Sequence, residues 1–191
     1  MSSTVIEMPY GGDMIQATLP TGRLLDTLQV SEAQALENRD HAIREAIENP
    51  IGLDQSIFQI VKPGETVAIV VPDSFRTTRI EQVLPILVDG LIAAGVAEED
   101  ITFVYATGTH RGPTAEEGRR ILGGGIYERF KDQVFTHDPR DEANLAYVGT
   151  TSRGTRVHIN RLVHEADRII ATGAVVLHYF GGYGGGRKSI V

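Results

Sequence analysis

The sequence predicts an α/β fold, with a Rossmann-like, mostly parallel sheet flanked by helices and a short β-hairpin at the N-terminus. The runs Thr66–Val71 and Ile101–Ala106 are short and rich in Val, Ile and aromatic residues. This composition is typical of strands that are buried on both faces of a parallel sheet. Helical patterns of about ten to sixteen residues separate such runs, and the alternation of strands with helices favours an α/β sheet.

The N-terminal part of the chain contains the hairpin and the first helix. Residues 4–19 alternate in polarity and break at Gly11-Gly12, which indicates two short antiparallel strands joined by a turn. Ser31 is predicted to cap a helix that runs to about Glu48. Serine suits this position because its side-chain oxygen accepts a hydrogen bond from the free N–H groups of the first helical turn.

The rest of the chain supplies further helices and strands. Arg79–Ala94 carries apolar residues at helical spacing and is followed by Gly95, so a helix is predicted there. Thr114 followed by Glu117 forms a capping-box pattern, which predicts the start of another helix. The remaining predicted elements are a hairpin from Leu145–Val148 and Arg156–Ile159, a strand over Arg168–Ala171, and a further strand through Val176.

Length and composition fit a single α/β domain over residues 1–191. Hydrophobic residues make up 41% and charged residues 23% of the chain, which argues against disorder. A net charge of −7 without a basic stripe argues against a nucleic-acid partner. The absence of Cys excludes disulfides, thiolate metal sites and a thiol nucleophile. No apolar run reaches the ~18 residues of a membrane span and no signal peptide is recognisable, so we expect a cytoplasmic protein without a membrane partner.

Polar side chains follow three predicted strands at the point where each strand ends. Asp73 and Arg76 follow the first strand, His110 follows the second, and His178 with Lys188 follows the third. Ligands of open α/β sheets bind outside the carboxyl ends of the strands. We therefore expect these five residues to meet in one cleft.

The residue types at these strand ends suit acid/base chemistry on a small anion. Arg76 can clamp a substrate carboxylate through its planar guanidinium, and Asp73 can orient a hydroxyl or a neighbouring group. His110 and His178 can each take or return a proton near neutral pH. Two imidazoles on opposite sides of a carbon centre would suit racemisation, whereas each of these residues alone could equally have a structural role.

The segment Gly181–Lys188 is a glycine-rich turn that ends in two cations. It matches the phosphate-loop pattern G-x-x-x-x-G-K-[ST] only in part, because Arg187 separates Gly186 from Lys188. The glycine amides and Arg187 could still bind a phosphate, and Lys188 could pair with an anion or attack a cofactor carbonyl or acyl group. A non-catalytic nucleotide- or phosphate-binding domain is therefore the alternative to an enzyme.

The remaining histidines carry little signal. His41 lies among Arg and Glu in the first predicted helix, and His137 lies in a turn sequence. His158 and His164 fall on or just past a hairpin strand, and no ligand spacing supports a metal site there. No metal ligand is therefore predicted within this chain.

Three motifs in order carry a family resemblance: Pro72-Asp73-x-x-Arg76, Thr107–Gly112 (TGTHRG) and His178–Lys188 (HYFGGYGGGRK). From about residue 5 to the last residue, the chain resembles the N-terminal domain of the nickel-dependent lactate racemase family. The third motif is the most specific of the three. The resemblance implies a two-domain racemase or epimerase of 2-hydroxy acids, with the active site between the domains.

The resemblance also implies roles for individual residues. Members use a nickel-pincer cofactor, a pyridinium mononucleotide that bears sulfur groups and is tethered covalently through a lysine, and Lys188 matches that position. His110 and His178 match the two acid/base histidines, and Asp73 and Arg76 match substrate-contacting positions. The implied reaction is hydride transfer from C2 to the cofactor and back to either face. The cofactor contacts expected besides Lys188 are Gly184, Gly185, Gly186 and Arg187.

Two departures from the family refine these expectations. Full members are considerably longer, and the additional part carries a histidine ligand for nickel and further substrate contacts. We therefore expect residues 1–191 to be an N-terminal domain without its C-terminal domain, inactive in isolation and open to self-association as a homodimer. Phe75 stands where a smaller polar residue is expected in lactate-acting members, which leaves a lactate-like acid or a sugar acid as the small-molecule substrate.

Overall fold

The computed structural model describes residues 3–28, 31 and 33–190. The chain forms two compact units, Met1–Glu37 and Asn38–Val191. No helix in the described ranges is long and apolar enough to cross a membrane.

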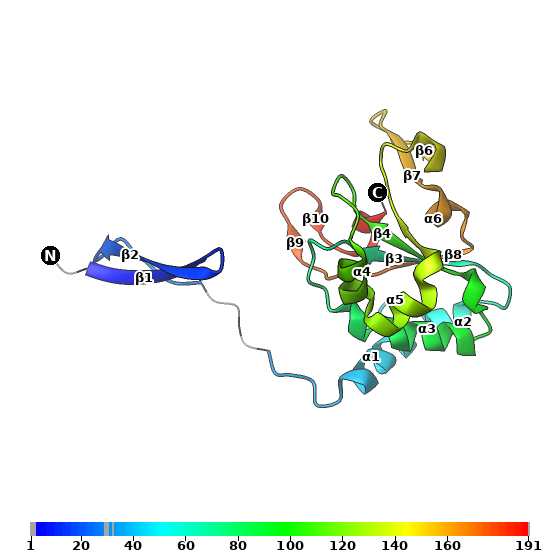
Figure 1. Ribbon diagram of the computed structural model, residues 1–191, viewed down its shortest axis with the longest axis horizontal. Coiled ribbons are helices and arrows are strands. Elements are labelled where there is room, and N and C mark those ends of the chain that lie inside the picture. The colour runs from blue at the N-terminus through cyan, green and yellow to red at the C-terminus, as the bar shows by residue number, and fades with distance from the viewer. Residues whose placement is uncertain (1–2, 29–30, 32, 191) are drawn as a thin grey trace. The chain divides into compact units, whose positions relative to one another are not determined.

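The first unit contains the predicted hairpin, formed by β1 (Ser3–Tyr10) and β2 (Asp13–Pro20) (Figure 1). The two strands pair in antiparallel register along their whole length, and the turn falls at Gly11-Gly12 as predicted. Gly11 has a φ of 65°, a left-handed conformation that glycine adopts without the steric cost of a side chain.

The second unit is built on four parallel strands, β3 (Val67–Pro72), β4 (Ile101–Ala106), β5 (Val134–Thr136) and β8 (Arg168–Ala171). Their order in the sheet is β5-β4-β3-β8, and every pairing is parallel, which confirms the predicted sheet. The chain leaves β3 toward β4 on one side and later returns to β8 on the other. Such a reversal creates a crevice at the carboxyl ends of the strands, where ligands of doubly wound sheets bind.

Helices cover both faces of this sheet (Figure 1). Successive residues of a strand point to opposite faces, so Ile69 and Val70 of β3 belong to different clusters. Ile69 packs in the larger cluster with Leu91 and Phe130, whereas Val70 packs in the smaller one with Val163. The helices are α1 (Arg39–Glu48), α2 (Ile57–Ile60), α3 (Leu84–Ala93), α4 (Ala115–Leu122) and α5 (Gly124–Phe130) on the first face, and α6 (Arg161–Glu165) on the second.

Two further hairpins stand beside the sheet. β6 (Leu145–Thr150) pairs with β7 (Arg156–Asn160), which confirms the second predicted hairpin. β9 (Leu177–His178) pairs with β10 (Gly182–Tyr183) inside the glycine-rich segment.

The helix predicted from Ser31 begins later, at Arg39. Asn38 caps it, because its side-chain oxygen accepts the backbone N–H of His41 at 3.1 Å. Glu32, which was part of that prediction, lies outside the described residues. Leu36 is 63% exposed, so extending the helix toward Ser31 would bury no apolar face, and burial is what stabilises helices in proteins.

The helix predicted over Arg79–Ala94 also begins later, at Leu84. Pro85 lies in the first turn of α3, where a missing N–H costs no hydrogen bond, whereas six residues into a longer helix it would break the helix. Arg79 has a φ of 55°, which is incompatible with a right-handed helix. The predicted helix lengths of ten to sixteen residues hold for α1 and α3, which span ten residues each, whereas α4 spans eight and α5 seven.

The strand predicted over Arg168–Ala171 is confirmed as β8, whereas the further strand predicted through Val176 does not form. The backbone N–H and the hydroxyl of Thr172 both donate to the carbonyl oxygen of Val70, at 2.9 and 2.8 Å. Gly173 then has a φ of 150°, which turns the chain away from the sheet. His178 consequently lies in β9. The prediction that it directly follows a strand of the main sheet is therefore wrong.

Candidate active site

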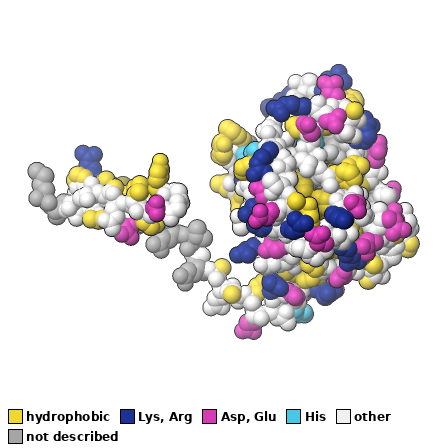
Figure 2. Space-filling model, viewed as in Figure 1, with side chains coloured by type: hydrophobic (Ala, Val, Ile, Leu, Met, Phe, Trp, Pro, Cys, Tyr) yellow, Lys and Arg dark blue, Asp and Glu magenta, His cyan; other side chains and the backbone are white. Residues whose placement is uncertain are grey.

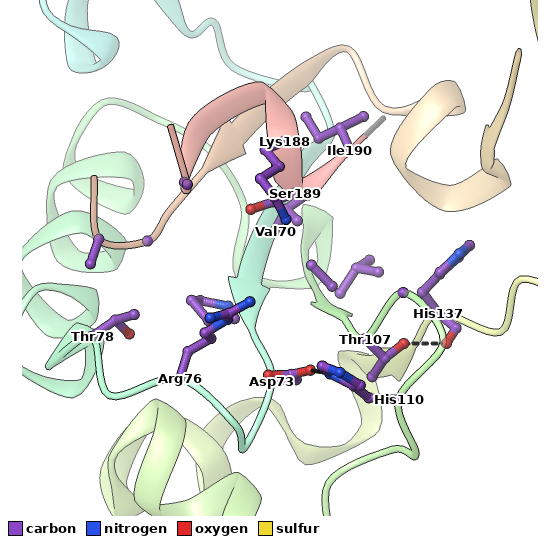
Figure 3. A pocket seen from close by; sticks show the side chains of 18 of the residues that line it. Val70, Asp73, Arg76, Thr78, Thr107, His110, His137, Lys188, Ser189 and Ile190 are labelled. Carbon is purple, nitrogen blue, oxygen red and sulfur yellow. Dashed lines mark hydrogen bonds and ion pairs between the residues drawn. The ribbon is translucent and has the colours of Figure 1, made fainter. Parts of the chain in front are cut away.

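A cavity of about 540 Å³ opens at the carboxyl ends of β3, β4 and β8 (Figure 3). Pro72, Ala106 and Gly173, from the ends of these strands, contribute to its wall. The sheet therefore brings the ends of β3, β4 and β8 to one place, as parallel strands do. The expected site residues Asp73, Arg76, His110, His178, Lys188, Gly184 and Gly185 all line the cavity, whereas Gly186 and Arg187 are not among its lining residues.

Asp73 is a buried carboxylate that holds His110. It directly follows β3 and is only 3% exposed. Its Oδ2 lies 2.5 Å from Nδ1 of His110, and its Oδ1 accepts the backbone N–H of Phe75 at 3.1 Å. An ionised carboxylate can only accept hydrogen bonds, so Nδ1 of His110 carries the proton. The other nitrogen of the neutral ring, Nε2, is then a proton acceptor.

An aromatic contact, with ring planes tilted by 51°, supports the ring of His110 from another side. The ring of Phe75 lies 4.6 Å from it, and the guanidinium of Arg111 lies 5.6 Å from the centre of the Phe75 ring. Arg111 donates two hydrogen bonds of 2.7 Å to Glu117, which also completes the predicted capping box with Thr114 at the start of α4. The Arg111 guanidinium, followed by the Thr114 amide, lowers the pKa of Glu117 to about 2, so this ion pair persists at neutral pH.

His178 is held by backbone amides instead of a carboxylate. Its Nδ1 accepts the N–H groups of Phe180 and Gly181, at 3.2 and 3.0 Å. Backbone amides only donate, so Nδ1 has no proton and the neutral ring carries its proton on Nε2. The ring of Tyr179 stacks on it, with centroids 5.1 Å apart and planes 10° apart. His178 therefore presents a donor where His110 presents an acceptor.

Lys188 reaches the cavity because the chain next to it packs on the sheet. Ile190 joins the smaller cluster around Val70, and Lys188 lies in the 3₁₀ turn Gly186–Ser189 just before it. The Lys188 side chain points into the cavity (Figure 3). It passes so close to Gly181 that a Cβ on that glycine would lie 3.4 Å from Cδ and Cε.

Glycines allow the end of the chain to return over β8. Gly185 has a φ of 70°, and a Cβ there would lie 3.0 Å from the carbonyl oxygen of Ala174. A Cβ on Gly173 would lie 3.3 Å from the Cα of Gly185. The amide of Gly184 donates to the carbonyl of Val176 at 2.7 Å. Two backbone segments thus lie in direct contact, and side chains on the glycines would push them apart.

Arg76 belongs to the same turn as Asp73. Its backbone N–H donates to the carbonyl oxygen of Asp73 at 3.3 Å. In Figure 3 its side chain and that of His137 lie at opposite sides of the cavity. A guanidinium in this position suits a carboxylate, because its planar donors match both oxygens.

Three polar residues that sequence reasoning did not assign to this site also line the cavity. His137 follows β5, and His158 and Asn160 belong to β7. Burial, opposed by the charge of Asp138, lowers the pKa of His137, so its ring is uncharged at neutral pH. With only three residues, β5 is too short to show a strand pattern in the sequence. If β5 had been predicted, His137 would have been recognised as a polar residue at a fourth strand end.

Comparison with known proteins agrees with the fold and the motifs. The family model for the lactate racemase N-terminal domain matches residues 10–191. The lactate racemase of Thermoanaerobacterium thermosaccharolyticum is 31% identical over 188 residues, and that of Lactiplantibacillus plantarum is 28% identical over 189 residues. Each alignment covers 97% of this chain and 43% of the relative. The chain therefore spans less than half the length of these relatives.

Among solved structures, the lactate racemase apoprotein from Thermoanaerobacterium thermosaccharolyticum matches with a TM-score of 0.78 at 31% identity. The match covers 98% of this chain and 43% of that chain. The sequence match and the structural match both extend over the sheet, the strand ends and the glycine-rich segment. The chain belongs to the lactate racemase N-terminal domain family.

Proposed function

We propose that this chain forms the substrate- and cofactor-binding wall of a racemase or epimerase that acts on lactate or another 2-hydroxy acid. The observation that carries the proposal is a pair of histidines of opposite hydrogen-bonding character in one cavity. His110 offers an acceptor at Nε2 and His178 offers a donor. An enzyme that inverts a hydroxyl-bearing carbon must exchange a proton with that hydroxyl in either orientation, and such a pair can do so. A module that only binds an anion needs no such pair.

The other residues of the wall have distinct roles in this proposal. Arg76 binds the substrate carboxylate and so orients C2 in the cavity. Nε2 of His110 accepts the proton of the substrate hydroxyl when C2 is oxidised to a carbonyl, and Nε2–H of His178 gives a proton to that oxygen, in its other orientation, when C2 is reduced again. Asp73 positions His110 through its bond to Nδ1, and because it also lines the cavity, its contact with the substrate stays part of the proposal.

The residues around Lys188 fit the nickel-pincer nucleotide that the family resemblance implies. A covalent tether needs an amine inside the cavity, and Lys188 supplies one. A bulky cofactor also needs a wall without side chains, which Gly184 and Gly185 provide. We include Gly186 and Arg187, which follow in the next turn, among the proposed cofactor contacts. When bound, the cofactor supplies the hydride acceptor for C2. The described residues contain no cluster of three metal ligands, so nickel would be held through the cofactor and through a histidine beyond these residues.

The proposal includes a C-terminal domain that closes the cavity. The curated relatives extend well beyond the aligned region, since the chain covers 43% of each. In this proposal the isolated N-terminal domain, residues 1–191, is inactive because the closing wall is missing. Its homodimerisation and its cytoplasmic location stay predictions.

The test uses the protein that carries this chain, produced in a host that makes the cofactor. A single enantiomer of lactate or of 2-hydroxybutanoate is incubated with it, and the products are separated by chiral chromatography. We expect both enantiomers to appear and the peptide with Lys188 to gain the mass of the cofactor. Both results should be lost in Lys188→Ala and kept in Lys131→Ala, a substitution at the end of α5 outside the cavity.

The same experiment can reject the proposal. If a known lactate racemase is loaded with cofactor in that host while this protein stays unmodified and inactive, the tether at Lys188 is wrong. The glycine-rich turn would then be explained better by the alternative predicted from the sequence, a site that only binds nucleotide or phosphate.

A further inference from the structure

One corner of the cavity has no role in the proposed reaction. It is formed by His137, His158 and Asn160. His137 comes from the loop after β5, and the other two come from β7, so the corner joins the edge of the sheet to the neighbouring hairpin. These residues add imidazole and amide groups to the wall that contains Val104, Ile159 and Thr107.

The hydrogen bonds of Asn160 define the protonation of His137. Oδ1 of Asn160 accepts the N–H groups of Leu162 and Val163, at 3.0 and 3.4 Å, and so caps α6. This cap fixes the orientation of the amide, and Nδ2 lies 3.4 Å from Nδ1 of His137. An amide nitrogen only donates, so Nδ1 of His137 accepts and the proton is on Nε2. His137 consequently offers one N–H donor that Asn160 does not use.

The backbone of His137 is fixed on both sides. Its N–H donates to the carbonyl oxygen of Tyr105 at 3.2 Å, and its carbonyl oxygen accepts the hydroxyl of Thr107 at 2.5 Å (Figure 3). Both partners belong to β4 or follow it directly, and both are buried. The position of the ring is therefore set before any ligand binds, which lowers the entropic cost of binding.

The ring of His137 is uncharged, and the cations of the cavity lie away from it. Burial lowers the pKa of His137, so its ring is neutral at neutral pH. The Lys and Arg residues that line the cavity are Arg76 and Lys188, and in Figure 3 both lie away from His137. Neutral imidazole and amide groups pair donor to acceptor with hydroxyl groups, while a carboxylate or phosphate would gain more beside the cations.

We propose that this corner is a hydroxyl-binding subsite, which takes a hydroxylated carbon chain at the end of the cavity opposite Arg76. The inference rests on the proposed function, since Arg76 would hold the substrate carboxylate and thereby direct the rest of the substrate toward His137. The preferred substrate is then a 2-hydroxy acid with further hydroxyl groups beyond C2, and not lactate. A ribose of the bound nucleotide offers the same chemistry, and the experiment separates these two sources.

The test compares two substitutions of His137 that differ in one donor. In His137→Asn, the side-chain oxygen can replace Nδ1 as the partner of Asn160, but no donor remains at the position of Nε2. In His137→Gln, the amide nitrogen retains a donor near that position. His164→Asn is the matched control, because His164 is an exposed histidine of α6 that does not line the cavity.

Two acids of equal chain length serve as substrates, 2,3,4-trihydroxybutanoate and 2-hydroxybutanoate. We expect His137→Asn to raise the KM for the trihydroxy acid about five- to tenfold, the value of one hydrogen bond, and to leave the KM for 2-hydroxybutanoate unchanged. His137→Gln should restore most of the loss, and His164→Asn should cause none. If instead both acids lose activity equally and the mass of the tethered cofactor is found on fewer chains, the hydroxyl belongs to the ribose. If neither acid nor the loading changes, the subsite is wrong.

A second readout separates this inference from the proposed function. The ring signals of His137 are followed by NMR while 2,3,4-trihydroxybutanoate or ribose is added to the protein, and they are assigned by their loss in His137→Asn. Shifts that saturate with either compound support the subsite even if the protein racemises no acid. Unchanged ring signals with both compounds would overturn it, whatever the outcome of the racemisation assay.

Discussion

The two histidines of the cavity belong to walls that are built very differently. His110 is tied to Asp73, which is 3% exposed and directly follows a strand of the main sheet. His178 lies in a hairpin whose strands have two residues each, and its neighbours Tyr179 and Phe180 are each 85% exposed. Figure 2 shows hydrophobic side chains gathered over this hairpin at the edge of the second unit.

This difference teaches which part of the site the chain can organise by itself. The wall formed by Asp73 and His110, here called the His110 wall, obtains its geometry from the buried core. Rigid strand ends hold its side chains in place. The wall formed by the glycine-rich segment around His178, here called the His178 wall, is little buried. It depends on hydrogen bonds from the backbone N–H groups of Phe180 and Gly181 to His178 and on close glycine contacts. We therefore expect the first wall to be organised before ligands bind, and the second to become so only when its exposed aromatic residues are covered.

The largest effect is expected for Asp73→Asn, which breaks the His110 wall. The amide nitrogen of Asn would donate to Nδ1 of His110, so the proton would move to Nε2 and the acceptor would be lost. We expect kcat to fall about 10²- to 10⁴-fold, the usual contribution of a general base, while the KM changes little. Asp89→Asn, on the exposed surface of α3, is the control. Equal losses in the two variants would show that a general change in charge, and not the orientation of His110, is responsible.

The next effect concerns the stability of the His178 wall. Gly185→Ala places a Cβ 3.0 Å from the carbonyl oxygen of Ala174 at a φ of 70°, so the loop must shift. We expect a cost of about 1–3 kcal/mol, which is expressed as local opening of the glycine-rich segment. The control is Gly124→Ala in α5, where no atom lies within 4 Å of the new Cβ and helix propensity favours Ala.

Limited proteolysis and hydrogen exchange measure this opening. Cleavage and exchange should accelerate between Gly173 and Lys188 in Gly185→Ala and stay unchanged along β3. Faster exchange throughout the sheet would show that the two walls unfold together, which would contradict the comparison.

A smaller effect is expected for Arg111→Gln, which loosens the support of His110 without touching Asp73. Arg111 links Glu117 to the ring of Phe75, and the Phe75 ring contacts that of His110. We expect kcat to fall about threefold to tenfold, since aromatic contacts contribute about 0.5–1.5 kcal/mol, while binding of the carboxylate is unchanged. The pH profile of kcat should broaden or shift if the ring becomes mobile.

A matched control for this substitution exists on α4, the helix that carries Glu117. Arg119 lies 5.0 Å from the ring centre of Tyr127 and donates to Glu128 at 2.7 Å, so it combines the same groups outside the cavity. Arg119→Gln should leave kcat unchanged. Equal losses in both variants would mean that Arg111 acts only through the stability of α4.

Local sequence patterns predicted the sheet and three of its strand ends, but not how those ends meet. The composition of Ile101–Ala106 is sufficient to recognise a buried strand, and its end places His110 beside the sheet. The bond between His110 and Asp73 depends on the parallel pairing of β3 with β4, which no local pattern encodes. Sequence reasoning therefore gave Asp73 a substrate contact, which stays a prediction, and did not foresee its bond to His110.

The polar corner was missed for a related reason. His137 follows a strand of only three residues, and Asn160 belongs to a separate hairpin. Neither segment has a periodic pattern that points to the cavity, and they are brought together by the packing of α6 on the sheet. Tertiary contacts of this kind can be recognised only after the topology is known.

The smallest effect is the pH dependence of stability that His137 contributes. Burial lowers the pKa of His137 below its ordinary value near 6.5, so below that pH the unfolded state binds more protons than the folded state. The free energy of unfolding should therefore fall as the pH decreases through about 6.5, until the folded ring is also protonated.

His137→Asn removes this contribution, so the stability lost between pH 7.5 and pH 5.0 in urea unfolding should be smaller in the variant. His41→Asn, at an exposed position of α1, should keep the full loss. An identical pH dependence in the protein and in His137→Asn would show that the ring gains or loses its proton equally well in both states, and burial would then not keep the His137 ring uncharged.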